Sequence, residues 1–415
     1  MENRLNGPAR WMLGQLADLR AVPALSRIAR AEQARELLQP NPVQQNHHVH
    51  LVEALDWLVR AQDATPDDGI ARGFSLIWNP YFRESGWQPS YPETTGYIIP
   101  TLYTAARWRA QAELASRATR AALWEIEVQL PSGAVQGGVI GQTAGPAIFN
   151  TGQVMLGWVA ALEETGRDVF EHALRRAANF LVSVEHGGEW TQCNSQFARS
   201  DTTAYNARTA WALAEAGQVL HEPRYSSCAA RILRRVAAAQ HDNGWFPDCC
   251  LNDAEHPLLH TIAYAMRGLL EGGRVLQDDR LLRAAARTGR AIQEVVRPDG
   301  WIAGRLDAKW RAVAPYSCLT GDAQMVNNWL RLAAITGDKT WLEKIEPVLT
   351  FLKQRQNSSS PIGGVRGAIA GSSPLYGEYG RYEMLSWATK FFADALMRDT
   401  SARTGLSLPA IARLA

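Results

Sequence analysis

LPSGAV (130–135) is the first of four glycine-centred turns that decide the fold of this chain. The other three are HGGEW (186–190), HDNGWF (241–246) and RPDGWI (297–302). Their central glycines follow one another at separations of 55, 56 and 56 residues. Such a constant period indicates one supersecondary unit that is repeated along the chain.

The sequence between two of these turns has room for two helices of different character. Residues 203–217 read TAYNARTAWALAEAG and carry few charges, which is typical of a helix surrounded by protein. In residues 225–240, Cys228, Ile232 and Val236 form one apolar stripe, and arginines occupy other positions. The repeat unit is therefore predicted to be a buried inner helix and an outer helix with one exposed face.

The same alternation along the whole chain predicts six helices of each kind. The inner helices are expected at 95–108, 150–165, 203–219, 257–275, 319–336 and 382–397. The outer helices are expected at 48–62, 113–129, 168–184, 224–240, 279–296 and 339–355. The first outer helix precedes any inner partner and the last inner helix lacks an outer one, so the two ends are expected to pair. The predicted fold is all-α, an (α/α)6 toroid; an open solenoid, which would leave two uncapped ends, is the alternative.

The toroid is assigned to residues 46–400. Residues 1–45 are expected to form an N-terminal helical extension packed on its outside, and residues 401–415 a C-terminal tail. The internal repeat overrides the two or three domains that a chain of 415 residues would otherwise suggest.

Composition narrows the class of protein. With 46% apolar residues and a net charge of +2, the chain has ample material for a core and lacks the concentrated positive field of a nucleic-acid binder. The sequence contains neither a signal-peptide core near its start nor a run of about 18 apolar residues, so a cytoplasmic protein without a transmembrane segment is expected. Five scattered cysteines fit a reducing compartment, and the oligomeric state is not readable.

Polar residues recur at one level of the predicted ring, where long connections enter the inner helices. Loops on one face of a rigid scaffold commonly carry function. Buried polar side chains are costly unless they are paired or face a wet cavity, which favours a site at this rim. The candidates are Glu93, Tyr97, Asn150, Gln153, Tyr205, Asn206, Arg208, His260, Tyr264, Asp322, Gln324, Glu378 and Tyr382, with Trp87 and Trp245 as aromatic contacts to sugar rings.

Single members of this set also have structural explanations. Asn150 suits a helix cap, and His260 alone suits a buried, hydrogen-bonded histidine. His260 and Tyr264 are four residues apart and share a helical face, so they could transfer protons together. Asn206 and Arg208 are two residues apart and do not share a face.

Three stretches resemble known proteins. FNTGQVMLGWVAALEETG (149–166) and HPLLHTIAYAMRGLLE (256–271) resemble inner-helix repeats of the (α/α)6-toroid carbohydrate-active enzymes, which include polysaccharide lyases, glucuronyl hydrolases and glucuronyl C5-epimerases. YPETTGYIIPTLY (91–103) is similar to an element of uncharacterised proteins that accompany bacterial exopolysaccharide synthesis. The resemblance implies a poly- or oligosaccharide substrate and no cofactor.

Two chemistries suit the candidate residues. In the first, Asn206 or Arg208 neutralises the carboxylate of a uronic acid, and His260 and Tyr264 act as base and acid at C5, giving elimination or epimerisation. In the second, Glu93 and Asp322 flank a glycosidic bond as the two carboxyl groups of a hydrolase. Uronate chemistry is preferred because the amide, arginine, histidine and tyrosine lie on consecutive inner helices.

Three other interpretations stay open. The turns QHDNGWF and RPDGWI are similar to repeats of terpenoid cyclases and prenyltransferase β subunits, although the chain has no acidic DxDD motif. Cys249, Cys250, His256 and His260 supply ligand types that zinc favours, but their spacing matches no zinc signature, and no metal is expected. The third interpretation is a helical ring that binds a glycan without catalysing a reaction on it.

Overall fold

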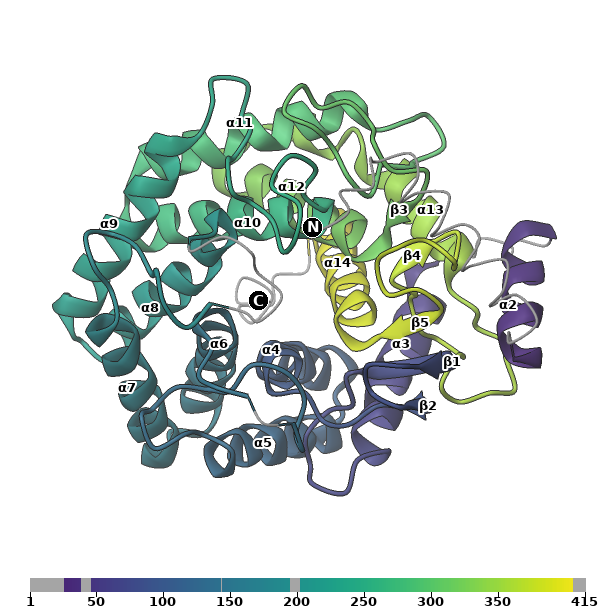
Figure 1. Ribbon diagram of the computed structural model, residues 1–415, viewed down its shortest axis with the longest axis horizontal. Coiled ribbons are helices and arrows are strands. Elements are labelled where there is room, and N and C mark those ends of the chain that lie inside the picture. Colours follow the sequence, from purple (N-terminus) through teal and green to yellow (C-terminus); the bar gives the residue numbers. More distant parts are fainter. Residues whose placement is uncertain (1–25, 39–45, 143, 195–201, 406–415) are drawn as a thin grey trace, which may run out of the picture.

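The computed structural model describes residues 26–38, 46–142, 144–194 and 202–405 of the chain. Their helices form two layers around a common axis (Figure 1). The inner layer consists of α4 (Pro92–Arg109), α6 (Ile148–Thr165), α8 (Ala207–Val219), α10 (Leu259–Leu276), α12 (Leu319–Thr336) and α14 (Ser386–Thr404). The outer layer consists of α3 (His47–Asp63), α5 (Ala112–Glu127), α7 (Asp168–Ser183), α9 (Pro223–Ala239), α11 (Asp279–Val295) and α13 (Ile345–Arg355). The predicted (α/α)6 toroid is confirmed.

The two layers differ in burial because they differ in composition. In α6 every residue from Ile148 to Ala161 is buried, and its first charged side chain is Glu163. In α11 the buried residues form one stripe that includes Leu281, Ala285 and Ile292, and charged side chains cover the opposite face. Inner helices are thus enclosed by protein, whereas outer helices have one face in water.

The glycines of the repeated turns allow each outer helix to dock on the next one. Gly133, Gly244 and Gly300 have φ values of 90°, 88° and 84°, in the left-handed region that favours glycine. A Cβ atom on Gly300 would lie 2.1 Å from the carbonyl oxygen of Pro347 in α13, and one on Gly133 would lie 2.4 Å from that of Arg176 in α7. At Gly133, Gly244 and Gly300 the period therefore reports a close approach of backbone to backbone, whereas an added Cβ on Gly188 would lie 3.5 Å from the carbonyl oxygen of Arg231, in ordinary contact.

The ring closes through the two ends of the helical sequence. The last inner helix, α14, packs against α3, α4 and α12. Gly367, with φ of 85°, brings the chain against α3, where an added Cβ would lie 2.1 Å from the carbonyl oxygen of Glu53. The predicted pairing of the first outer helix with the last inner helix is the one observed.

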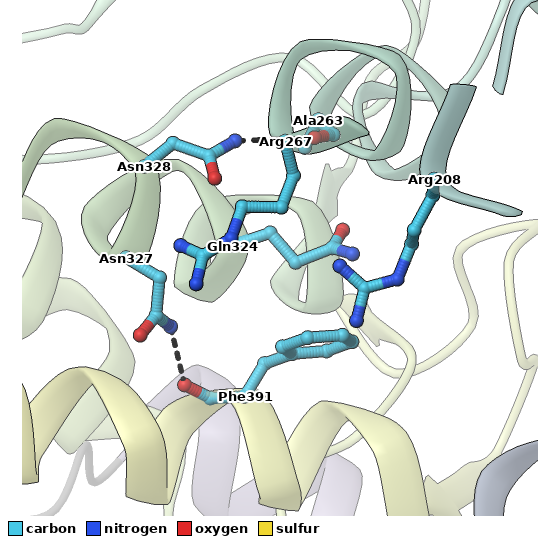
Figure 2. Close-up of a pocket in the computed structure, with 7 residues that line it drawn as sticks. All are labelled: Arg208, Ala263, Arg267, Gln324, Asn327, Asn328 and Phe391. Atoms are coloured by element: carbon cyan, nitrogen blue, oxygen red, sulfur yellow. Dashed lines mark hydrogen bonds between the residues drawn. The ribbon is translucent and has the colours of Figure 1, made fainter. Parts of the chain in front are cut away.

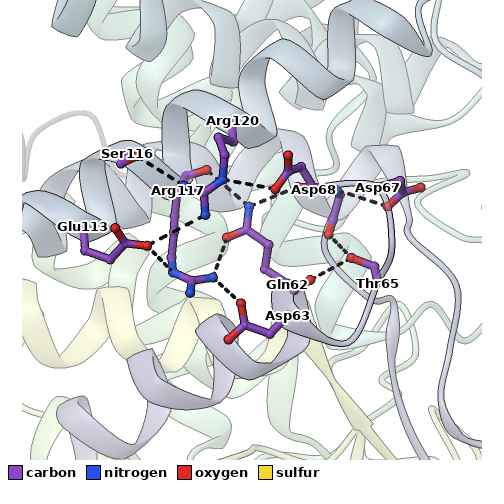
Figure 3. A network of polar contacts seen from close by, with 10 residues as sticks. Gln62, Asp63, Thr65, Asp67, Asp68, Glu113, Ser116, Arg117 and Arg120 are labelled. Atoms are coloured by element: carbon purple, nitrogen blue, oxygen red, sulfur yellow. Dashed lines mark hydrogen bonds and ion pairs between the residues drawn. The ribbon is translucent and has the colours of Figure 1, made fainter.

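Side chains reinforce the seam between α3 and α5 (Figure 3). The amide Nε2 of Gln62 donates hydrogen bonds to the carbonyl oxygens of Asp68, at 3.0 Å, and Arg117, at 3.2 Å. The guanidinium of Arg117 forms ion pairs with Asp63, at 2.6 Å, and Glu113, at 3.1 Å. One glutamine and one arginine thus join two outer helices and the turn that follows α3.

Short strands, which were not predicted from the sequence, lie on one face of the ring. β1 (Gly73–Asn79) lies between β2 (Glu84–Trp87) and β5 (Glu383–Leu385) in an antiparallel sheet. β3 (Ser317–Cys318) pairs with β4 (Ser372–Ser373). The strands lie in the long connections that enter α4, α12 and α14, so they shape the rim of the ring where the site was predicted.

Helix α2 (Arg27–Leu38) lies outside the ring (Figure 1). It is held by the amide of Asn357, which donates to both carboxylate oxygens of Glu32 at 2.8 and 2.9 Å. Tyr382 adds a hydrogen bond of 2.9 Å from its hydroxyl to Oε1 of Gln33. Tyr382 also precedes α14, which begins at Ser386 and not at 382 as expected.

The ends of the chain are described in part. α14 continues to Thr404, four residues beyond the expected boundary of the toroid at residue 400. Residues 1–25, 39–45 and 406–415, which belong to the predicted extension and tail, lie outside the described residues. Within the part of the chain that the structure describes, each helix is too short or too polar to cross a membrane.

Candidate active site

A cavity of about 650 Å³ opens at the rim where the inner helices begin. We call it the central cavity. Its walls come from the β1–β2 hairpin, from the starts of α4, α6 and α10, and from the connections before α12 and α14. The lining side chains that carry polar or aromatic groups include Arg72, Asn79, Tyr81, Tyr91, Glu93, Phe149, Tyr205, Asn252, His260, Tyr264, Arg305, Glu378, Tyr379 and Trp387.

Glu93, in the first turn of α4, is the carboxyl group set deepest in this wall. The hydroxyl of Tyr91 donates a hydrogen bond to its Oε2 at 2.5 Å. Burial raises the pKa of Glu93 to about 7, and the Tyr91 hydrogen bond and the charges of Arg72 and Arg208 limit that rise. Near neutral pH both the acid and the carboxylate are populated, which suits a group that donates or accepts a proton.

His260, in the first turn of α10, supplies a neutral imidazole. Its Nδ1 lies 2.9 Å from Oε1 of Gln324, which can only accept a hydrogen bond. The ring proton therefore resides on Nδ1, and Nε2 is left as the nitrogen that can accept a proton. Burial lowers the pKa of His260 to about 3, which keeps the ring uncharged at neutral pH.

Aromatic rings surround these two groups. The ring centroid of His260 lies 4.3 Å from that of Tyr264 and 5.3 Å from that of Tyr379. Phe149 contacts both Tyr264, at 4.9 Å, and Tyr205, at 5.2 Å. Flat rings with polar edges form a surface on which a sugar can stack while its hydroxyl groups are hydrogen-bonded.

Two arginines line the cavity, and each is paired with a carboxylate. Arg72 forms an ion pair of 3.1 Å with Glu383, and its guanidinium lies over the ring of Trp387 at 5.0 Å. Arg305 binds both carboxylate oxygens of Glu378 at 3.2 Å. Every guanidinium nitrogen of Arg305 already donates within the protein, whereas the hydrogen bonds of Arg72 to Gln88 and Glu383 both come from its Nη1. Arg72 is therefore the better placed of the two to bind a carboxylate of a ligand.

Five of the predicted site residues lie in the wall of the central cavity: Glu93, Tyr205, His260, Tyr264 and Glu378. Two others support that wall. Asn150, next to Phe149 in α6, donates from its Nδ2 to the carbonyl oxygen of Gln136 at 3.0 Å, and Gln324 orients His260. Predicted residues of α4, α6, α10 and α12 thus lie at the same rim of the ring.

A second group of predicted residues lies beneath the cavity. Arg208 is 1% exposed, and its Nε donates to Oε1 of Gln153 at 2.6 Å. Its guanidinium lies over the rings of Tyr264, at 4.9 Å, and Tyr97, at 5.9 Å. Because Tyr264 lies between Arg208 and the central cavity, Arg208 cannot meet a sugar carboxylate there.

The remaining predicted residues face elsewhere. Asp322 is fully buried and accepts a hydrogen bond of 2.5 Å from the hydroxyl of Ser317. Asn206 donates to the side chain of Asn194. Trp87 packs against Trp57 from the hairpin, and Trp245 packs against Trp310 in an outer turn. Tyr382 contacts α2. None of these five side chains lines the central cavity.

Sequence reasoning missed Tyr91, Arg72, Arg305, Tyr379 and Trp387. Tyr91 directly precedes the predicted Glu93 and could have been found as a neighbour that hydrogen-bonds to it. Arg72 and Arg305 lie in loops that carry no repeat, and only the folded chain shows that they face the cavity.

The suspected metal ligands have other partners. The thiol of Cys249 donates to the carbonyl oxygen of Thr261 at 3.3 Å, and His256 pairs with Asp253 at 3.0 Å. Across residues 26–38, 46–142, 144–194 and 202–405, no group of three or more His, Cys, Asp or Glu side chains is arranged to hold a metal ion.

No family model matches this chain. No curated protein sequence matches it either. Solved structures do match. One is an unsaturated glucuronyl hydrolase from Bacillus sp. GL1, responsible for the degradation of glycosaminoglycan. It superposes with a TM-score of 0.68 and 13% sequence identity, and the match covers 86% of this chain and 97% of the hydrolase. Cellobiose 2-epimerase from Bacillus thermoamylovorans superposes with a TM-score of 0.65 and 10% identity, covering 89% of this chain and 98% of the epimerase. D-mannose isomerase superposes with a TM-score of 0.65 and 13% identity, covering 86% of this chain and 97% of the isomerase.

The chain has their fold. These neighbours are all (α/α)6-toroid carbohydrate-active enzymes, so the resemblance seen in the inner-helix repeats is confirmed at the level of architecture. One architecture hosts hydrolysis, epimerisation and isomerisation among them, so the reaction of this chain has to be argued from its own side chains.

Proposed function

We propose that this chain is a carbohydrate-active enzyme that removes the C5 proton of a uronic acid unit in a poly- or oligosaccharide. The observation that carries the proposal is the position of His260 and Glu93. They lie on α10 and α4, which take opposite places among the six inner helices, and both side chains line the central cavity. A sugar bound between them would have a proton-transfer group on each face.

His260 is placed to be the base because its Nε2 carries a lone pair, and the negative carboxylate of a bound uronic acid would raise its pKa from about 3 toward the range in which an imidazole accepts a proton. It takes the C5 proton and becomes an imidazolium, while the electron pair moves into the carboxyl group to form an enediolate. Arg72, which lines the cavity, would stabilise that charge. This role replaces the one expected for Arg208 and Asn206, which do not line the cavity.

Glu93 is suited to be the acid, because a pKa of about 7 keeps much of it protonated at neutral pH. If Glu93 protonates C5 from the opposite face, the product is the C5 epimer. If it protonates the oxygen on C4 as the C4–O bond breaks, the product is an unsaturated uronate and a free chain end. Tyr264, beside His260, is the alternative acid.

The experiment is to incubate the protein with uronic-acid polysaccharides and neutral polysaccharides in D₂O. Deuterium at C5, read by NMR, supports proton abstraction; ultraviolet absorbance of a conjugated product identifies elimination. His260→Asn should abolish these signals, Glu93→Gln should abolish formation of the epimer or the conjugated product, and Asn206→Ala, outside the cavity, should retain all of them. Exchange that survives in both His260→Asn and Glu93→Gln would refute the assignment.

Glycoside hydrolysis is the second candidate, and the raised pKa of Glu93 favours it. Two carboxyl groups, Glu93 and Glu378, line the central cavity. Glu93 would protonate the glycosidic oxygen, and Glu378 would act as base or nucleophile in the place expected for Asp322. Reducing ends without deuterium at C5 and without a conjugated product would support it. Glycan binding without any product would point to the non-catalytic alternative.

A further inference from the structure

The ring of Tyr264 separates a buried arginine from the central cavity. Tyr264 lines the cavity, where its ring contacts His260 at 4.3 Å and Phe149 at 4.9 Å. The guanidinium of Arg208 lies over the same ring at 4.9 Å, beneath the cavity. An aromatic ring carries no counter-charge, so the positive charge of Arg208 acts across it on the space where a ligand would bind.

The position of Arg208 is fixed by its surroundings. It is the second residue of α8, and its Nε donates to Oε1 of Gln153 at 2.6 Å. Trp211 and Phe391 enclose the guanidinium at 5.3 and 5.5 Å. Figure 2 shows the guanidinium above the ring of Phe391, with the side-chain amide of Gln324 beside it. The charge is therefore held at one place beneath the cavity.

Within the part of the chain that the structure describes, no carboxylate contacts the guanidinium of Arg208. Two buried carboxylates, Asp394 and Glu271, act on it from a distance. Asp394 is paired with Lys390 at 2.7 Å. Glu271 is paired with Arg331 at 2.7 Å. The charge of Arg208 is therefore only partly compensated, and buried surroundings screen it less than water would.

The charge of Arg208 reaches both proton-transfer groups of the cavity. Burial raises the pKa of Glu93 to about 7, and Arg208 is one of the charges that limit this rise. Burial lowers the pKa of His260 to about 3, and Arg208 adds to this decrease. Both effects have the sign of a positive potential, which stabilises a carboxylate and destabilises an imidazolium.

We propose that Arg208 is a specificity-determining residue that acts through the ring of Tyr264 and favours ligands that bring a negative charge into the central cavity over neutral sugars of the same shape. This role rests on the proposed function in one respect, that the ligand is a sugar. Arg72 lines the cavity and can touch the ligand. Arg208 acts at a distance, so its effect depends on the charge of the ligand and not on the shape.

The same charge links selection to the state of His260. A bound carboxylate would offset the effect of Arg208 on the imidazole and raise the pKa of His260. A neutral sugar brings no such charge, so it would leave His260 a weaker base. Arg208 would thus discriminate between the two kinds of sugar both in binding and in proton transfer.

The carboxylate of Glu93 is a negative charge already present in the cavity, so its titration tests the potential there without a ligand. It can be followed by NMR of protein labelled with ¹³C at the glutamate carboxyl carbons and assigned with Glu93→Gln. We expect Arg208→Met to raise the pKa of Glu93. Arg208→Lys, which keeps the charge, should leave that pKa closer to its value in the unaltered protein. An unchanged pKa in Arg208→Met would overturn the proposal.

The binding of two sugars tests the selectivity itself. D-glucuronate carries a carboxylate where D-glucose carries a hydroxymethyl group, and NMR titration measures the affinity of each. Arg208→Met should weaken glucuronate by about tenfold and glucose by less than about twofold, because a unit charge about 10 Å away at a dielectric constant of about 20 has roughly that effect. Equal losses for the two sugars would show a structural role and contradict the proposal.

Two variants complete the test. Arg283→Met removes the same charge from an exposed position on α11 and should change neither measurement. If Arg208→Met does not fold, as judged by circular dichroism, Arg208→Gln takes its place. If neither sugar binds to the unaltered protein, the titration of Glu93 decides alone. That titration involves no turnover, so it separates failure of the role of Arg208 from failure of the proposed reaction.

Discussion

Gln356 and His50 are 306 residues apart in the chain and are joined by two hydrogen bonds. Nε2 of Gln356 donates to the carbonyl oxygen of His50 at 3.0 Å, and its Oε1 lies 2.6 Å from Nδ1 of His50. Nε2 also donates to the carbonyl oxygen of Gly367 at 2.9 Å. One buried glutamine side chain thus ties the end of α13 to the start of α3, across the seam that closes the ring.

Gln356→Leu should lower the free energy of unfolding by about 2–3 kcal/mol, because it leaves buried acceptors without donors. Urea denaturation followed by circular dichroism measures this loss. Gln129→Leu, at the seam between α5 and α7, provides the comparison, since Nε2 of Gln129 donates to Gly133 and Ala173 in the same way. A loss below about 0.5 kcal/mol at Gln356, with a large loss at Gln129, would show that the closing seam contributes little.

Gly300→Ala should be far more destabilising than Gly166→Ala, although both glycines have positive φ. The new Cβ at position 300 would lie 2.1 Å from the carbonyl oxygen of Pro347, whereas no atom lies within 4 Å of the one at position 166. We expect losses of ~3 kcal/mol or more for Gly300 and ~1 kcal/mol for Gly166. Equal losses in urea denaturation would mean that backbone strain alone, and not the contact with α13, explains the repeated glycine.

The repeat could be predicted from the sequence because its cause is local. A glycine is required wherever a turn must adopt a positive φ and touch the next outer helix, as at Gly133 and Gly300, and the resulting period is visible in one sequence. The glutamines that cross the same seams are equally regular. Gln129 and Gln240 were missed because their partners are backbone carbonyl groups, which any residue supplies.

The site could be predicted only where it belongs to the repeat. Glu93 and His260 begin inner helices, so the expected level of the ring placed them correctly in the cavity. Asp322 begins one as well, but its carboxyl group turns to Ser317, because side-chain direction within a turn depends on the neighbouring loop. Arg72 and Arg305 come from such loops, whose course the periodicity does not describe.

Activity should depend on pH through Glu93. If Glu93 is the acid, kcat/KM should fall as the pH rises through its pKa of about 7, and Glu93→Gln should reduce the rate by ~100-fold or more. The hydrogen bond from Tyr91 stabilises the carboxylate, so Tyr91→Phe should move the descending limb to higher pH. If the descending limb of the pH profile keeps its position in Tyr91→Phe, a group other than Glu93 is responsible for the titration.

Stability should depend on pH through His260. Its pKa is lowered in the folded protein, so the unfolded chain binds a proton more readily than the folded one. The contribution of the neutral ring to stability is complete above the ordinary histidine pKa of about 6.5 and is lost as the pH falls toward 3. His260→Asn should weaken this loss of Tm in acid; His172→Asn on the outer helix α7 should leave the loss unchanged.

The pairing of α3 with α14 also sets when this protein can become active during its synthesis. The chain makes five of its six inner helices before Ser386, but α14 supplies Trp387 to the central cavity and the partner that α3 lacks. Until the ribosome has passed Thr404 and released that helix from its exit tunnel, the nascent ring stays open and the outer helix made first waits for the inner helix made last.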